Sequence, residues 1–252
     1  MKLEKIIEFM EEIAPVDGAM EYDNVGLLLG RGEKEVTRVL TSLDCTLEVV
    51  REAIEKGCEL IVCHHPVMFG GVKKITDDTK EGAMLLLAAE NSVAIFACHT
   101  NLDFAQGGLN DYFLKKLGFE ATGAIVENEG RIFETGGMTV KELCGKIKET
   151  FDVPYLRVAG DVERESAVGA LCTGSGKSLL GEAMEKADVY ITGDMGHHDI
   201  LTAIENDCVY IEISHYDSEK IAMELLWSKL SQRFDGIEVF QSRENKNPLT
   251  FV

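Results

Sequence analysis

Histidine is the residue type whose placement in this chain most directly indicates chemistry. All six histidines lie in short polar segments, each at or just after the C-terminal end of a predicted strand. Proteins of the α/β class bind ligands at that edge of the sheet, so the pattern predicts a shared site rather than separate core residues. The histidines are His64, His65, His99, His197, His198 and His215.

The pair His64-His65 is followed by Pro66, which affects how the two rings lie. Neighbouring side chains of a regular strand point to opposite faces, so both rings converge only where the strand has stopped. Pro66 provides that stop because proline cannot continue a central ladder. The cysteines just before these tips, Cys63 and Cys98, are expected to face the core as small hydrophobic residues.

Carboxylates follow two of the histidines at one spacing, as His99-x-x-x-Asp103 and His215-x-x-x-Glu219. We expect Glu219 to begin a helix over 219–230, where an acidic residue also complements the helix dipole. Together with the histidine pair, these groups exceed what one tetrahedral ion needs, so we predict two divalent metal ions that share ligands. A nitrogen and oxygen set suits zinc, iron, manganese, nickel or magnesium and does not distinguish them.

The elements that must position these residues repeat an order of helix, strand and polar tip. Short apolar segments alternate with segments of helical spacing, which is the pattern of β-α-β units. The order returns in the second half, where 182–186 resembles 52–56 and 203–206 resembles 88–91. We interpret this as an ancient duplication. The alternative is a general likeness among helix-to-strand junctions.

We therefore predict an α/β fold of two similar lobes, with mainly parallel sheets covered by helices. The first lobe is expected over 1–120 and the second over 166–252, with 121–165 as a bridging or inserted segment. The clearest element of that segment is a helix that Thr139 and Glu142 cap reciprocally.

Composition excludes several classes of protein. The chain has 44 acidic and 25 basic residues and a net charge of −19, so strong nucleic-acid binding is not expected. Seven scattered cysteines without a C-x-x-C pair indicate neither a disulfide framework nor a thiolate zinc site, and they suit a cytoplasmic protein. The glutamates of the first helix argue against a signal peptide, and no apolar stretch is long enough to span a membrane.

Two glycine-containing segments resemble anion-binding loops. Gly174-Ser175-Gly176-Lys177-Ser178 lacks the first glycine of a P-loop, because Leu171 stands at that position. It is either a tight strand-to-helix turn or a weak anion site. Gly70-Gly71-Val72-Lys73-Lys74 follows the histidine pair and either holds a phosphate or is a solvated surface loop.

In order and spacing, seven motifs resemble those of the NIF-three-like dinuclear metal-binding family, whose members are often labelled GTP cyclohydrolase I type 2 homologs. The resemblance spans nearly the whole chain. The motifs are Tyr22-Asp23-Asn24-Val25-Gly26-Leu27, Leu43-Asp44-x-Thr46, His64-His65-Pro66, His99-Thr100-x-x-Asp103, Gly174-Ser175-Gly176, Thr192-Gly193-Asp194 and His215-Tyr216-x-Ser218-Glu219.

The resemblance implies a toroidal homo-hexamer of two-domain subunits with a two-metal site at the cleft between the halves. It also implies a proton-transfer or supporting role for His99, and it matches His197 and His198 to a less certain histidine tip. The sequence departs from the family at Tyr22, where Trp is usual, at Ser214, where Gly is common, and at Gly136-Gly137, which replaces a stretch with proline. The implied metal ligands are His64, His65, Asp103, His215 and Glu219.

Two functions follow from such a site. The first is a metal-dependent hydrolase of a nucleotide or related small molecule, in which His99 and Glu219 move protons. Phosphorylated compounds are one class of substrate for such an enzyme. The second is a non-catalytic metal-binding structural or adaptor protein, whose ions contribute folding energy.

Overall fold

The computed structural model describes residues 1–250, which form two compact α/β units. Unit 1 contains Met1–Ala105 and the segment from Ala222 onward, and unit 2 contains residues 106–221. These ranges differ from the predicted lobes in two places. The segment after Ala222 belongs with the first sheet, and most of the expected bridging segment belongs to unit 2.

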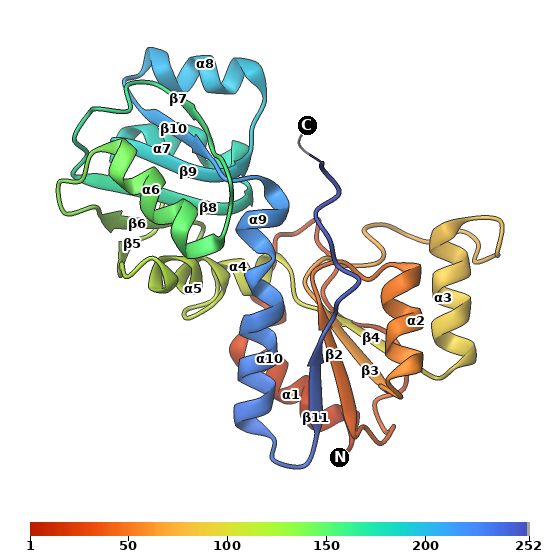
Figure 1. Cartoon of the computed structure of the whole chain (residues 1–252). Helices are drawn as coiled ribbons and strands as arrows, with labels where there is room; N and C mark the ends of the chain where they lie inside the picture. The colour runs from red at the N-terminus through yellow and green to blue at the C-terminus, as the bar shows by residue number, and fades with distance from the viewer. Residues whose placement is uncertain (251–252) are drawn as a thin grey trace. The chain divides into compact units, whose positions relative to one another are not determined.

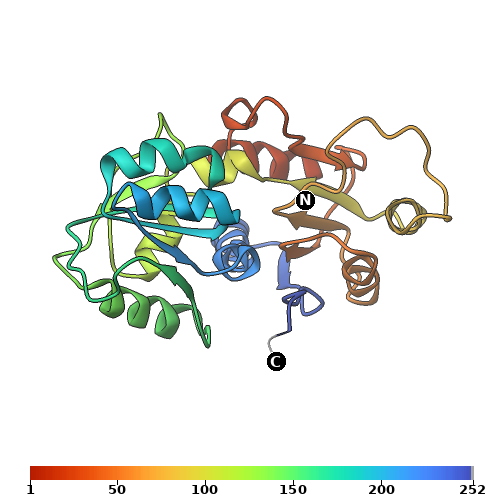
Figure 2. The same ribbon diagram turned by 90° about the horizontal axis from the view of Figure 1, so that it is seen from above.

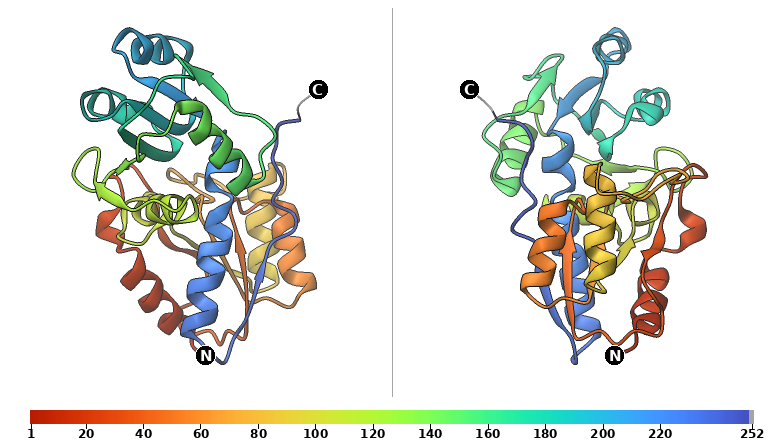
Figure 3. Two further views of the ribbon diagram at one scale, coloured as in Figure 1. Left: turned by 60° about the vertical axis from the view of Figure 1, so that its left-hand side comes forward. Right: turned by 90° about the vertical axis from the view of Figure 1, so that its right-hand side faces the viewer.

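Unit 1 is built on a sheet with strand order β1-β4-β3-β2-β11. Strands β2, β3, β4 and β11 run parallel and β1 is antiparallel to β4. Helices α2 and α3 cover one face and α1 and α10 lie on the other, as Figures 1 and 3 show. The elements are α1 Leu3–Ile13, β1 Gly26–Leu29, β2 Arg38–Ser42, α2 Leu47–Glu55, β3 Leu60–Cys63, α3 Lys80–Glu90, β4 Ala94–Ala97, α4 Thr100–Phe104, α10 Ile221–Arg233 and β11 Glu238–Gln241, with a 3-10 turn at Val16–Gly18.

Continuous apolar runs produce the central strands of unit 1. Strands β3 and β4 are buried along their whole length, as strands covered on both faces must be. Leu40, Ile61 and Ile95 pack against α2 and α3. On the opposite face, the rings of Phe9 and Phe234 meet edge to face at 5.3 Å, which joins α1 to the end of α10.

Unit 2 is built on a sheet with strand order β5-β6-β8-β9-β10-β7, of which β8, β9 and β10 are parallel. Helices α7 and α8 cover one face and α6 the other (Figure 2). Thr139 and Glu142 form the predicted capping box of α6. The elements are α5 Leu109–Lys116, β5 Ala121–Gly123, β6 Arg131–Glu134, α6 Val140–Phe151, β7 Arg157–Ala159, β8 Val168–Ser175, α7 Leu180–Lys186, β9 Val189–Asp194, α8 His197–Glu205, β10 Val209–Glu212 and α9 His215–Glu219, with a 3-10 turn at Lys177–Leu179.

The two units contain one repeated succession of elements. The series α1-β1-β2-α2-β3-α3-β4-α4 of unit 1 has the same order and strand pairing as α6-β7-β8-α7-β9-α8-β10-α9 of unit 2. The second copy therefore begins with α6, whereas the sequence interpretation began it after 165. What lies between the copies is α5, β5 and β6.

Backbone details support this correspondence. The residue before α1 forms an isolated antiparallel bridge, Lys2 with Glu35, and the residue before α6 forms the same bridge, Thr139 with Glu165. The chain thus enters α1 and α6 through the same kind of backbone pairing. Gly30 after β1 and Gly160 after β7 both have positive φ, 131° and 108°. A Cβ at either glycine would meet the first residue of β4 or β10, so both positions require glycine.

A carboxylate anchors the first parallel strand in each copy. Oε2 of Glu59 accepts from the backbone N–H groups of residues 37 and 38 at 3.0 and 2.9 Å. Oδ2 of Asp188 accepts from those of residues 167 and 168 at 2.8 and 3.0 Å. Burial raises the pKa of Asp188, but the backbone N–H groups and Arg164 outweigh it and lower the pKa below its ordinary value.

None of the helices among the described residues combines the length and the apolar character that crossing a membrane requires. The cysteines of the described residues are free thiols, and Cys63 and Cys98 are fully buried, as predicted.

The hydrogen bonds of Asp188 predict that Asp188→Asn is less stable than wild type at neutral pH and equally stable in acid. Losing the charge weakens two hydrogen bonds, so we expect about 1 kcal/mol less stability at neutral pH. A lowered pKa stabilises the fold above the unfolded value of about 4, and this stabilisation disappears as the pH falls toward the folded value. Urea unfolding of wild type and variant, followed by circular dichroism, should therefore converge in acid.

Glu185→Ala, which removes one negative charge from the exposed side of α7, is the matched control and should leave stability within about 0.5 kcal/mol. A difference between wild type and Asp188→Asn that stays constant with pH would contradict the anchor.

Candidate metal centre

In unit 1 the histidine pair lies where β3 stops. The N–H of His64 donates to the carbonyl of Ser42 and the N–H of His65 to that of Leu43, at 3.1 and 2.9 Å, which ties this tip to the end of β2. The two rings lie 5.1 Å apart, tilted by 43°. Both imidazoles therefore converge beyond the strand, the geometry predicted from Pro66.

The tip of β4 brings further potential ligands to the same place in unit 1. His99 precedes α4, and its ring centroid is 5.2 Å from that of His64 and 5.5 Å from that of His65. One ring nitrogen from each of the three histidines lies within 4.8 Å of the others. Asp103 is buried in α4, and its Oδ1 is 3.6 Å from Nε2 of His64. Unit 1 alone thus collects three imidazoles and a carboxylate at strand ends.

An oxygen occupies the Nδ1 side of each of these rings. Nδ1 of His64 is 2.8 Å from the carbonyl of Cys98, and Nδ1 of His65 is 2.8 Å from Oδ1 of Asp44. Nδ1 of His99 is 2.9 Å from the nearer oxygen of Asp23. An acceptor at Nδ1 assigns the proton to that nitrogen, so the Nε2 lone pair is available to a cation.

Asp23 is the most strongly held of these acceptors. It accepts from the ring of His99 and from both the N–H and the hydroxyl of Thr100, at 3.1 and 2.6 Å. Burial raises its pKa, but these hydrogen bonds outweigh the effect and hold the pKa far below its ordinary value. Asp23 is therefore a fixed anion that orients the His99 ring.

In unit 2 a second pair of potential ligands lies on α9. His215 is the first residue of this short helix, and its Nε2 is 3.0 Å from Oε2 of the buried Glu219. Its Nδ1 is 2.7 Å from Oδ2 of Asp194, so the Nδ1–oxygen arrangement recurs. The hydrogen bonds to Asp194 and Glu219 raise the pKa of His215 to about 10. The metal-free ring is thus protonated at neutral pH.

The structure corrects the helix predicted for this region and shows how the two histidine-carboxylate motifs correspond. Glu219 ends α9 and the long helix begins only at Ile221, so the helix expected over 219–230 is two helices. Strand pairing also places β4 and β10 in equivalent registers, which makes Ser214 the counterpart of His99. The motif ending in Glu219 is therefore displaced by one residue from the motif ending in Asp103.

Ser214 adopts a backbone conformation that glycine favours, with φ 74° and ψ 149°. Its hydroxyl accepts from the N–H of Asp217 at 3.1 Å and donates to Oδ2 of the same residue at 2.8 Å. This local bonding offsets part of the strain. A glycine at this position would adopt the same conformation without strain, because it has no Cβ.

Two glycines leave room for α9 in unit 2. Gly174 has φ 64°, and a Cβ there would collide with Oε1 of Glu219. A Cβ on Gly193 would lie 2.8 Å from Cα of His215 and 2.9 Å from the hydroxyl of Ser218. The two glycine motifs of the sequence therefore set the position of the His215 and Glu219 side chains.

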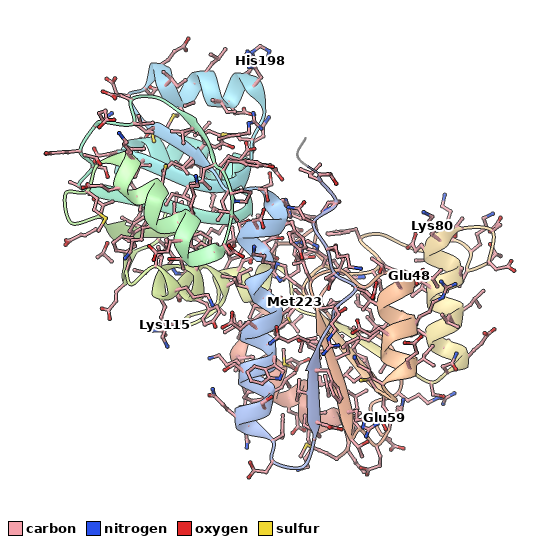
Figure 4. The ribbon with its side chains drawn as sticks, in the orientation of Figure 1. Glu48, Glu59, Lys80, Lys115, His198 and Met223 are labelled. Atoms are coloured by element: carbon pink, nitrogen blue, oxygen red, sulfur yellow. The ribbon has the colours of Figure 1, made fainter. Side chains whose placement is uncertain are left out.

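His197 and His198 begin α8 and are exposed, with their rings 5.3 Å apart. Figure 4 shows His198 at the end of α8, on the surface of unit 2. Among the residues that the structure describes, neither joins a group of three potential metal ligands. Two of the six histidines that the strand-end pattern assigned to a shared site therefore lie on the surface.

Sequence reasoning gave no role to Asp23, Asp44 and Asp194. Each lies in a recognised motif, and Asp44 and Asp194 come at or just after the end of a strand. That placement was the only signal in the sequence. The hydrogen bonds to histidine rings appear only in the folded chain.

Comparison with known proteins identifies the family. The family model described as Duf34/NIF3 (NGG1p interacting factor 3) matches residues 1–248. This chain belongs to the DUF34/NIF3 family. A Clostridium perfringens protein named GTP cyclohydrolase 1 type 2 homolog is 38% identical over 263 residues, which cover 100% of both chains.

Solved structures of related proteins agree with the two-lobed fold. A Staphylococcus aureus protein is 30% identical and superposes with a TM-score of 0.92, covering 100% of this chain and 99% of its own. A Bacillus cereus protein related to NIF3 gives a TM-score of 0.93 at 23% identity over the same shares. The DUF34/NIF3 fold predicted from the motifs is therefore confirmed.

Close packing at Gly193 predicts that Gly193→Ala displaces α9 of this DUF34/NIF3 protein. Overpacking of this kind costs about 1–3 kcal/mol. We expect a lower melting temperature and faster hydrogen exchange of the α9 amides.

Gly181→Ala is the control, because a Cβ at that position in α7 meets open space and alanine favours helix. It should leave exchange in α9 unchanged. Equal exchange in the Gly193→Ala variant would contradict the packing argument.

Proposed function

We propose that this protein binds two divalent metal ions. Three of the proposed ligands, His64, His65 and Asp103, come from unit 1, and two, His215 and Glu219, come from unit 2. The observation that carries the proposal is the oxygen at Nδ1 of each histidine ligand, found in both units. Histidines that bind metals nearly always donate their second ring N–H to such an oxygen.

The types of the proposed ligands fit a divalent cation. Imidazole nitrogens and carboxylate oxygens suit zinc, iron, manganese, nickel and magnesium to different degrees. Asp103 and Glu219 are buried. Buried carboxylates are stable where hydrogen-bond donors, cationic groups or a metal ion surround them. A bound cation would be one such partner.

We propose further that the protein is a hydrolase of a nucleotide or related small molecule. When bound, the two cations would supply Lewis acidity and lower the pKa of a water. His99 would hold or pass a proton at Nε2, because Asp23 fixes its Nδ1 side. Glu219 would accept a proton through its carboxylate. The names of the curated relatives favour this reading over other chemistry.

The second candidate is a non-catalytic metal-binding structural or adaptor protein. It is favoured by the burial of Glu219 and Asp103, since groups enclosed in this way suit ions that stabilise a fold. In that case no exchangeable coordination position is needed. Measured turnover of a substrate distinguishes the hydrolase from the structural or adaptor protein.

Metal content is the first test. Purified protein should carry about two metal equivalents per chain, and His65→Ala and Glu219→Ala should each lose at least one. His198→Ala removes a surface imidazole from α8 and should keep both. Metal analysis by mass spectrometry after dialysis measures the outcome, and wild type without bound metal would contradict the proposal.

A hydrolysis screen over nucleotides, phosphodiesters and amides tests catalysis. Metal-dependent turnover should vanish in His65→Ala and Glu219→Ala and persist in His198→Ala. If wild type shows no turnover and the two ligand variants lose metal and melt at lower temperature, the structural role is correct instead.

We also propose the homo-hexamer that the family resemblance implies. The formula mass of one chain is 27.8 kDa. Sedimentation equilibrium of the wild-type protein should give six times that mass. A monomer or dimer at micromolar concentration would contradict it.

A further inference from the structure

The chain segment that follows β11 passes the tip of β2, which contacts the proposed metal ligand His65 of unit 1. The N–H of Ser242 donates to the carbonyl of Thr41 at 2.8 Å, which extends the pairing of β11 with β2 by one residue. The segment thus reaches the C-terminal end of β2, where Asp44 is located. Up to this point the segment is therefore held by the fold of unit 1.

A buried carboxylate on α2 fixes the segment. Glu52 is 7% exposed and accepts from the hydroxyl of Ser242 at 2.6 Å and from the N–H of Arg243 at 3.1 Å. Lys56, the residue that follows α2, lies 3.5 Å from the same carboxylate. Charge-assisted hydrogen bonds to a buried anion hold the chain firmly at these residues.

Asn245 then makes a double contact with the tip of β2. Its Oδ1 accepts from the N–H of Leu43 at 2.8 Å, and its Nδ2 donates to the carbonyl of Asp44 at 3.1 Å. One amide side chain therefore fixes two successive residues. Leu43 and Asp44 in turn contact His65, through its backbone N–H at 2.9 Å and its Nδ1 at 2.8 Å.

We propose that Asn245 is a positioning residue of the metal centre, which holds Asp44 so that its carboxylate orients the ring of His65. The proposal rests on the proposed metal-binding function. Its chemistry is specific to an amide, because only Asn and Gln carry an acceptor and two donors on one planar group. Aspartate lacks the donor, and alanine would leave the N–H of the buried Leu43 without this acceptor.

Asn247 provides a matched control. It is the same residue type two positions later, and its Oδ1 accepts from the N–H of Leu249 at 2.9 Å within the segment itself. Truncating it removes an amide and its hydrogen bond to Leu249, and keeps the two hydrogen bonds between Asn245 and the tip of β2. Asn245→Ala and Asn247→Ala thus differ in whether the Asp44 tip loses its support.

The first measurement is the affinity of the metal-free protein for Zn²⁺, titrated against a competing chelator. Loss of a group that orients a ligand typically lowers metal affinity about 10–100-fold. We expect at least a 10-fold loss at one site in Asn245→Ala and no change in Asn247→Ala. Equal affinities of these two variants would overturn the proposal.

A double-mutant cycle with Asp44→Ala shows whether Asn245 acts through Asp44. If it does, Asn245→Ala should cause no further loss of affinity in the Asp44→Ala background. Fully additive losses would mean that Asn245 affects binding by another route, and would overturn the proposal as stated.

Nuclear magnetic resonance of ¹⁵N-histidine in the metal-free protein gives a readout that does not depend on metal. The Nδ1–H signal of His65 should be protected from exchange in wild type and in Asn247→Ala, and should exchange faster in Asn245→Ala. If wild type binds no metal, the proposed function fails, but this signal still decides the role of Asn245. An unchanged His65 signal in Asn245→Ala would overturn it.

Discussion

The hydrogen bond from a histidine Nδ1 to a fixed oxygen is the interaction on which the candidate metal centre depends. It occurs at His64, His65 and His99 in unit 1 and at His215 in unit 2, with distances of 2.7–2.9 Å to the nearest oxygen. Each bond sets the orientation of a ring and the position of its proton. Three features hold these oxygens or rings in place. They are the ends of the strands, the contacts of the segment after β11 and the glycines near α9.

Equivalent positions of the two copies have different roles in the candidate metal centre. Strand pairing makes Gly193 the counterpart of His64 and Asp194 the counterpart of His65. In unit 1 this tip supplies two proposed ligands. In unit 2 it supplies space for α9 and an acceptor for the His215 ring. The two copies thus present similar sheet edges whose residues have separate roles.

Much of the fold could be predicted from local patterns. Helix α6 begins directly after the predicted cap at Thr139, and β3 ends directly before the predicted stop at His64. A fully buried apolar run and a reciprocal cap are strong local signals. The sequence does not reveal that the region before 165 belongs to the second copy, because β7 is short and exposed at its start and its partner β10 is distant in sequence. Edge strands of this kind carry little periodicity of their own.

The sequence by itself determined the family, the α/β class and the residue types gathered at the strand ends. Those depend on composition, spacing and short-range periodicity, which can be read along the chain. Only the tertiary structure decided that Asp23, Asp44 and Asp194 orient histidine rings, that His197 and His198 lie on the surface, and that Asn245 reaches the tip of β2. These contacts join residues up to 202 positions apart. Hydrogen bonds depend on distance and direction in space, and sequence separation specifies neither.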